Sequence, residues 1–181
     1  MFHPFTHHIY QEVSIMKRLL LVLTIVMSMF LMISCDKDDD NDTTGPATVD
    51  VWVGTWLSAG TNVSPLLSGA TFNIDSIRVE MKDNKTITTA SHVKDGAWTT
   101  LTGTYAVTKA ASGDIHSIEI VYTAYSQGGI IQVVKGSPDT MQLEVIQTVP
   151  AIPFTPRTPA TGFGSDAALG VLNIQKYVRI K

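Results

Sequence analysis

The residues of this chain best suited to chemistry are its single cysteine, Cys35, and its five histidines. A lone cysteine forms no disulfide within one chain, so its thiol is available for modification. Only His92 and His116 follow Cys35, and the strand pattern described below places them on different strands. They lack the close spacing and the neighbouring cysteine of a metal site. We therefore expect no metal site and no cofactor.

The residues that precede Cys35 predict an export signal. Lys17 and Arg18 come before a mostly apolar run of 15 residues, Leu19 to Ile33. A membrane-spanning helix needs roughly 20 apolar residues, whereas this shorter run is typical of a signal peptide. Met32-Ile33-Ser34-Cys35 resembles the lipobox of bacterial lipoproteins. In that family the cysteine sulfur carries a diacylglycerol, so the resemblance implies lipid attachment at Cys35 and anchoring to a membrane.

The chain divides into three parts on this interpretation. Residues 1–34 are the leader, with Met16 as the predicted true start, 35–49 are the lipidated cysteine and a tether, and 50–181 are the folded domain. Residues 36–42 contain five Asp, but they lack the Gly at loop position six and the Glu at position twelve of an EF-hand. The run resembles instead the surface-export signal of Bacteroidota lipoproteins, which implies exposure on the outer face of the outer membrane.

Charge limits the partners of the folded part. Residues 43–181 contain ten Lys and Arg and ten Asp and Glu, so this region is formally neutral. Without a basic cluster it cannot attract a polyphosphate, and we expect no nucleic-acid partner. We expect a monomer.

The folded part is expected to be all-β. Short runs rich in Val, Ile, Thr, Tyr and Trp alternate with turn residues, which predicts strands. We predict eight, at 50–58, 71–81, 85–93, 97–108, 115–124, 129–135, 140–149 and 171–180. The connections from the second strand to the seventh have hairpin lengths and contain Asp-Gly, Gly-Gly and Asp-Asn pairs. A run of successive hairpins is a meander. An eight-stranded meander removes its exposed edges by closing into an antiparallel up-and-down barrel.

The two ends of the domain carry a second resemblance. Gly54-Thr55-Trp56 resembles the Gly-x-Trp motif that opens the first strand of lipocalins and other calycins. In that family the Trp fills the narrow end of the barrel and packs under an Arg of the last strand, a position that Arg179 offers here. The resemblance implies a lipocalin-like barrel. The chain departs from it in lacking the usual disulfide and a helix before the last strand.

Two long connections stand out, residues 59–70 and 150–170. Because successive connections of an up-and-down barrel alternate between its ends, both are expected at the same end. We predict that this end is a ligand mouth with five candidate contact residues: Leu66, Leu67, Phe154, Arg157 and Phe163. The proline-rich connection is either a lid over a ligand or a strap that covers apolar barrel surface.

The sequence favours binding over catalysis. Gly162-Phe163-Gly164-Ser165 follows a proline-rich loop rather than a strand, so it is neither a nucleophile elbow nor a dinucleotide loop. We therefore expect that the protein is not an enzyme. The resemblance to lipocalins implies a small apolar or amphipathic ligand inside the barrel. The alternative is a filled barrel whose loops bind a glycan or a partner protein.

Overall fold

A computed structural model describes residues 49–181 of the chain. The expected leader (1–34), the lipid attachment at Cys35 and almost all of the tether (35–49) lie outside the described residues.

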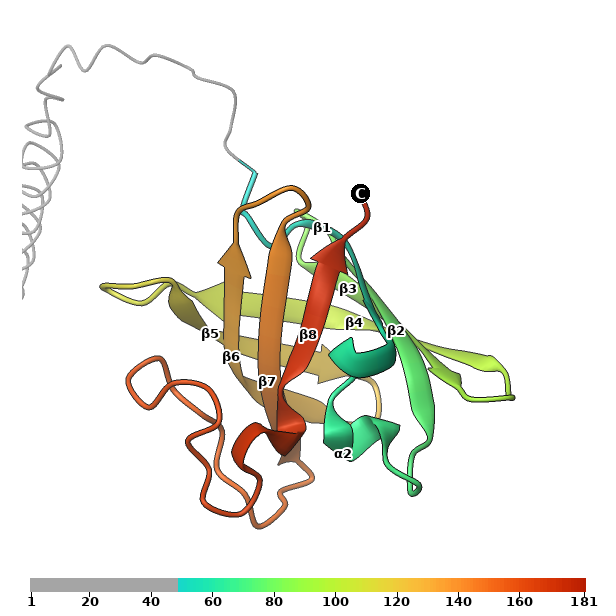
Figure 1. Cartoon of the computed structure of the whole chain (residues 1–181). Helices are drawn as coiled ribbons and strands as arrows, with labels where there is room; N and C mark the ends of the chain where they lie inside the picture. Colours follow the sequence, from blue (N-terminus) through green and yellow to red (C-terminus); the bar gives the residue numbers. More distant parts are fainter. Residues whose placement is uncertain (1–48) are drawn as a thin grey trace, which may run out of the picture. The chain divides into compact units, whose positions relative to one another are not determined.

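The described residues form one closed β-barrel (Figure 1). Its eight strands are β1 (Gly54–Ala59), β2 (Ile74–Met81), β3 (Thr86–Val93), β4 (Trp98–Thr108), β5 (Ile115–Tyr122), β6 (Ser126–Val134), β7 (Thr140–Val149) and β8 (Gln175–Arg179). Each strand pairs antiparallel with the next, and β8 returns to β1, with Trp56 opposite Arg179. The predicted eight-stranded up-and-down barrel is therefore confirmed, and this architecture is consistent with a lipocalin-like fold.

Four strands, β1, β2, β6 and β8, begin three or four residues from their predicted starts. The first strand begins at Gly54 rather than at residue 50, because the Val53 N–H turns back to the Asp50 carbonyl at 3.0 Å. The sixth begins at Ser126, because the pair Gly128 and Gly129 lies within the sheet rather than in a turn. A Cβ at Gly129 would lie 2.0 Å from the Glu144 carbonyl oxygen, so close strand approach explains that glycine.

The last strand begins at Gln175 because a 3₁₀ turn, η2 (Gly170–Asn173), precedes it. A single turn precedes η2, closed by a 2.8 Å hydrogen bond from the Gly170 N–H to the Asp166 carbonyl. The connection after β1 contains a 3₁₀ turn, η1 (Gly60–Asn62), and a short helix, α2 (Pro65–Ser68), which was not predicted. Among residues 49–181, no helix has the length and apolar character that crossing a bilayer requires.

The barrel core follows the expected alternation along the strands. Ile118, Ile120 and Tyr122 point inward from β5, and Met141 and Leu143 point inward from β7. Leu101 of β4 keeps the inward register, opposite Thr89, but is 42% exposed. The β3–β4 hairpin extends past the rest of the barrel, which explains this exposure (Figure 1).

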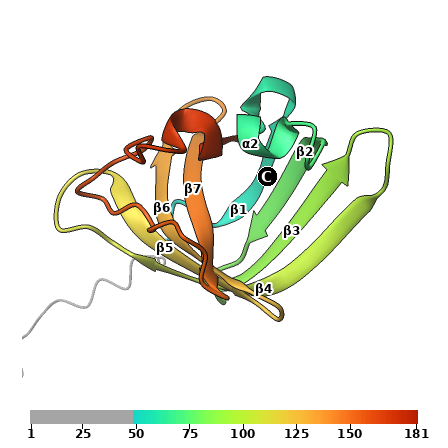
Figure 2. The same ribbon diagram turned by 90° about the horizontal axis from the view of Figure 1, so that it is seen from below.

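The connections are distributed unequally between the two ends of the barrel. The mouth end carries the two long connections, 60–73 and 150–174, and there α2 packs against η2 (Figure 2). The Ser64 N–H donates to the Gln175 side chain at 2.9 Å and fixes this contact. The plain end carries three short turns, at 82–85, 109–114 and 135–139, together with residues 49–53 and Lys181. The long connections therefore share one end, as expected.

Candidate ligand-binding cavity

The barrel contains a cavity of about 240 Å³ in the half near the mouth end. Sixteen residues line it: Leu67, Ile74, Ile77, Val79, Ile87, Thr89, Ser91, Ile120, Tyr122, Tyr125, Gln127, Leu143, Val145, Asn173, Gln175 and Tyr177. Seven of the sixteen are aliphatic residues of the strands, three are tyrosines and five are other polar residues. Leu67 of α2 and Asn173 of η2 belong to the mouth-end connections, so those connections close part of the opening.

Several polar groups of the cavity wall are paired within the protein. The Tyr122 hydroxyl lies 2.8 Å from the Thr89 hydroxyl. The Gln175 amide donates to the Ser58 hydroxyl at 2.6 Å, and the Asn173 amide donates to the Val145 carbonyl at 2.8 Å. These bonds hold β8 and η2 against strands β1 and β7. The polar atoms in these bonds therefore already stabilise the barrel.

Tyr177 differs from these residues. It is only 4% exposed and lines the cavity, yet its hydroxyl makes no hydrogen bond to any of residues 49–181. The hydroxyls of Tyr125 and Ser91 and the side-chain amide of Gln127 also line the cavity and also lack a partner within the described barrel. Because these atoms face the cavity, they can form hydrogen bonds with a ligand's polar groups.

The cavity tyrosines are held in their neutral form. Burial raises the pKa of Tyr122 to about 12, against the opposing effect of its hydrogen bond with Thr89. Burial also raises the pKa of Tyr177 far above its ordinary value, and that of Tyr125 above it. A tyrosine of ordinary pKa is already protonated near neutral pH, and the raised pKa values extend the range in which these three hydroxyls can donate a hydrogen bond to more alkaline pH.

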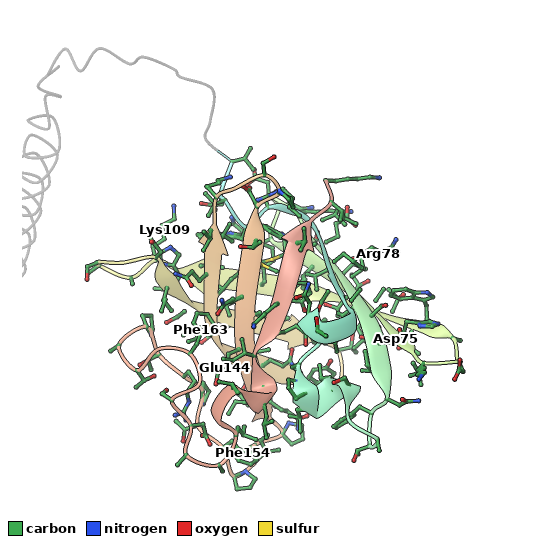
Figure 3. The ribbon with its side chains drawn as sticks, in the orientation of Figure 1. Asp75, Arg78, Lys109, Glu144, Phe154 and Phe163 are labelled. Carbon is green, nitrogen blue, oxygen red and sulfur yellow. The ribbon has the colours of Figure 1, made fainter. Side chains whose placement is uncertain are left out.

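Of the five predicted mouth residues, the structure brings only Leu67 to the cavity. Leu66, its neighbour on α2, is 38% exposed. Phe154, Arg157 and Phe163 do not line the cavity. On the long connection, Phe163 lies beside β6, and Phe154 lies beyond the mouth-end tips of the strands (Figure 3).

That long connection is a strap on the outer face of the barrel. Glu144 points outward from β7, is 2% exposed, and accepts a 2.8 Å hydrogen bond from the Gly164 N–H of the connection. Ile130 of the neighbouring strand also faces outward and is fully buried. Arg157 forms an ion pair with Asp166 at 3.2 Å, within the strap itself. Of the two alternatives for the proline-rich segment, the structure favours the strap over the lid.

Gly54, Trp56 and Arg179 come together at the plain end. The Arg179 guanidinium carbon lies 4.2 Å from the centre of the Trp56 ring, and Trp56 is fully buried. The same guanidinium donates to Asp139 at 3.0 Å and to the Val53 carbonyl at 2.6 Å. A Cβ at Gly54 would lie 2.2 Å from Arg179 Nη1, so only glycine leaves room for the arginine. The sequence did not indicate the role of Asp139, because its turn is far along the chain from β1, which carries Trp56, and from β8, which carries Arg179.

A second group of side chains gathers outside the barrel beside the turn of the β3–β4 hairpin. His92 Nδ1 and Asp75 Oδ1 lie 2.7 Å apart, and this hydrogen bond lowers the pKa of Asp75. The Trp98 ring lies 5.1 Å from the His92 ring and 6.0 Å from the Arg78 guanidinium, and Trp98 is 49% exposed. We name these four residues the Trp98 cluster. No pattern in the sequence indicates this cluster, which forms because strand pairing places Trp98 opposite His92.

The described residues show no further chemistry of the kinds considered. Within 49–181, no three side chains of His, Cys, Asp or Glu gather as metal ligands would. His116 lies on β5, where its ring contacts the edge of Trp52 at 5.7 Å and its Nδ1 accepts from the Ala110 N–H at 3.3 Å. It therefore supports the plain end of the barrel rather than the cavity.

Comparison with protein-family models, curated proteins and solved structures gives no match to this chain. The fold is therefore established by its strand pairing, and the candidate site by the geometry of the cavity. The likeness of Gly54, Trp56 and Arg179 to the lipocalin motif stays an interpretation of three residues.

Proposed function

We propose that the barrel binds a small amphipathic molecule in its interior cavity. The observation that carries this proposal is the Tyr177 hydroxyl, which belongs to a residue only 4% exposed, faces a cavity of about 240 Å³ and has no partner among residues 49–181. Eight-stranded barrels are just wide enough to be filled by side chains or to hold one small ligand. Apolar walls with a few convergent polar groups are typical of ligand sites.

Native mass spectrometry tests this proposal. The full chain, released from the membranes of its own cells, should retain a small molecule that dissociates on activation in the gas phase. Val145→Phe places an aromatic ring at the cavity wall and should abolish this retention. Thr102→Phe adds the same ring to the exposed outer face of β4 and is the matched control. Equal retention by both variants would place the molecule elsewhere and contradict the proposal.

The proposed setting is the cell surface. The lipobox at Met32–Cys35 supports lipid attachment at Cys35, and the Asp-rich run after it supports export to the outer face of the outer membrane. Residues 49–53 reach the barrel at its plain end, so a tether before them joins the end opposite the mouth. Cys35→Ala should release the protein from membranes after a carbonate wash. Digestion by protease added to intact cells should occur if the barrel faces outward.

The Trp98 cluster favours a second candidate, an interaction module that binds a glycan. A half-exposed indole offers an apolar face for a sugar ring, and Arg78 with the Asp75–His92 pair offers hydrogen bonds to hydroxyls. Binding of purified protein to immobilised glycans should be lost in Trp98→Ala. It should persist in Val121→Ala, which removes another half-exposed side chain from the outer face of β5.

We propose a binding role rather than catalysis for the cavity. Among its lining residues only the three tyrosines titrate, and burial raises the pKa of each, so they are poor general bases near neutral pH.

A further inference from the structure

The charge of the cavity narrows the class of ligand. None of its sixteen lining residues is an Asp, Glu, Lys, Arg or His. An ionised group that entered would lose its hydration and meet no opposite charge, which is strongly unfavourable. A bound carboxylate, phosphate or ammonium is therefore disfavoured within the cavity.

The volume of the cavity limits the size of the ligand. An apolar protein cavity of roughly 150 Å³ accommodates benzene. Scaling from that case, a cavity of about 240 Å³ accommodates about ten non-hydrogen atoms. This corresponds to a fused bicyclic ring, or to one ring with a short substituent. A long-chain fatty acid or a phospholipid is too large.

The unpartnered polar atoms set the arrangement of the ligand's polar groups. Tyr177 lies within β8, and its hydroxyl keeps its proton, so it can donate to an acceptor in the cavity. Tyr125 lies in the β5–β6 connection at the mouth end, and Gln127 follows it on β6. Tyr122 adjoins Tyr125, with ring centres 4.9 Å apart, but its hydroxyl is already paired with Thr89. Aliphatic side chains of strands β2, β3, β5 and β7 also line the cavity.

We propose that the cavity's ligand is an uncharged ring compound of about ten non-hydrogen atoms with a hydrogen-bond acceptor that meets Tyr177 Oη. A second polar group, where the ligand has one, faces Tyr125 and Gln127 at the mouth. This inference rests on the proposed binding function and specifies its ligand class. It excludes free fatty acids and intact lipids from the cavity itself.

Calorimetric titration of the full chain in lipid nanodiscs tests the ligand class, with protein-free nanodiscs as the blank. The probes form two matched pairs. 1-Indanone carries a carbonyl acceptor, and indane is the same bicycle without it. Methyl 3-phenylpropanoate is neutral, and 3-phenylpropanoate is the same skeleton with a negative charge. Palmitate serves as the long-chain probe.

We expect 1-indanone to bind more tightly than indane, and Tyr177→Phe to weaken 1-indanone by about two- to tenfold while leaving indane unchanged. The neutral ester should bind more tightly than the carboxylate by more than about tenfold. Val145→Phe should remove all of this binding, and Thr102→Phe should not. Circular dichroism of each variant establishes that the barrel is intact.

The outcomes separate the ligand class from the binding function. Tighter binding of 3-phenylpropanoate or palmitate than of the neutral probes, abolished by Val145→Phe, would overturn the ligand class and leave a binding cavity. Equal affinity of 1-indanone for the wild-type protein and Tyr177→Phe would overturn the role of the tyrosine. Absence of heat from every probe, with no molecule retained in native mass spectrometry, would overturn the binding function as well.

Discussion

The two ends of the barrel differ in how their polar side-chain atoms are used. At the plain end a single arginine, Arg179, covers the buried Trp56 ring and donates to Asp139 and to the Val53 carbonyl. Near the mouth end a tyrosine of the same strand, Tyr177, is buried with no partner for its hydroxyl among the described residues. Two residues apart on β8, one side chain uses its polar atoms for stability and the other leaves its polar atom available.

The plain end also contains a polar atom without a hydrogen-bond partner. The indole N–H of Trp52 is buried there without a geometrically acceptable partner in residues 49–181. Its ring nevertheless packs against His116 and lies 5.4 Å from the Lys109 ammonium. The two ends differ in the accessibility of the polar atom. The indole nitrogen is buried, although Trp52 lines an open hollow of about 460 Å³ at the plain end, whereas the Tyr177 hydroxyl faces the interior cavity.

The variant expected to have the largest effect on stability is Trp56→Ala. Trp56 is fully buried beneath Arg179, so its loss should lower the free energy of unfolding by about 3–5 kcal/mol. Trp98→Ala, at a half-exposed tryptophan near the mouth, should change it by less than about 0.5 kcal/mol. Urea denaturation of both variants measures the contrast. Similar losses of unfolding free energy in the two variants would contradict a special role of the plain end in stability.

Alkaline pH should weaken the barrel through the cavity tyrosines. Because burial raises the folded-state pKa of Tyr122 from 10.0 to about 12, the unfolded chain loses this proton first. The stabilisation is fully present below pH 10 and falls as the pH rises toward 12, by about 3 kcal/mol for this group. Tyr177 shifts in the same direction. Denaturant midpoints measured across this range check the effect, which should be smaller in Tyr122→Phe.

Much of the fold was predictable because its determinants are local. Alternating inward residues such as Ile118 and Ile120, and hairpin turns such as Lys94-Asp95-Gly96, act over a few neighbours. The same local logic misled at Gly128 and Gly129. A glycine pair is typical of a turn, but here it lies within β6, where Gly129 allows close approach to the Glu144 backbone.

The candidate site was less predictable because it depends on contacts between distant segments. Arg157 and Phe163 sit in a mouth-end connection, yet a hydrogen bond from Gly164 to Glu144 of β7 holds that connection on the outer face of the barrel. Nothing in the sequence pairs these residues. Whether Tyr177 faces space or another side chain likewise depends on the summed volumes of sixteen residues from most of the elements.

A smaller effect compares glycines at the two ends. Gly54→Ala should cost about 2 kcal/mol, because its φ of +146° is strained for any other residue and its Cβ would collide with Arg179. Gly60→Ala, in the mouth-end connection, has a φ of +58° and no atom within 4 Å of its Cβ. It should cost about 1 kcal/mol, the backbone strain alone. Thermal or urea unfolding of the two variants gives the difference.

The smallest expected effect on stability is the most informative. Tyr177→Phe removes a hydroxyl that has no partner in the described barrel, so the ligand-free protein should keep its stability or gain slightly. Tyr122→Phe is the matched control, because it removes a hydroxyl 2.8 Å from Thr89 and should cost about 1 kcal/mol at neutral pH. If Tyr177→Phe were instead as costly as Tyr122→Phe, its hydroxyl would have a structural partner. The cavity would then lose the atom that we assign to the ligand, and the contrast between Tyr177 and Arg179 would disappear.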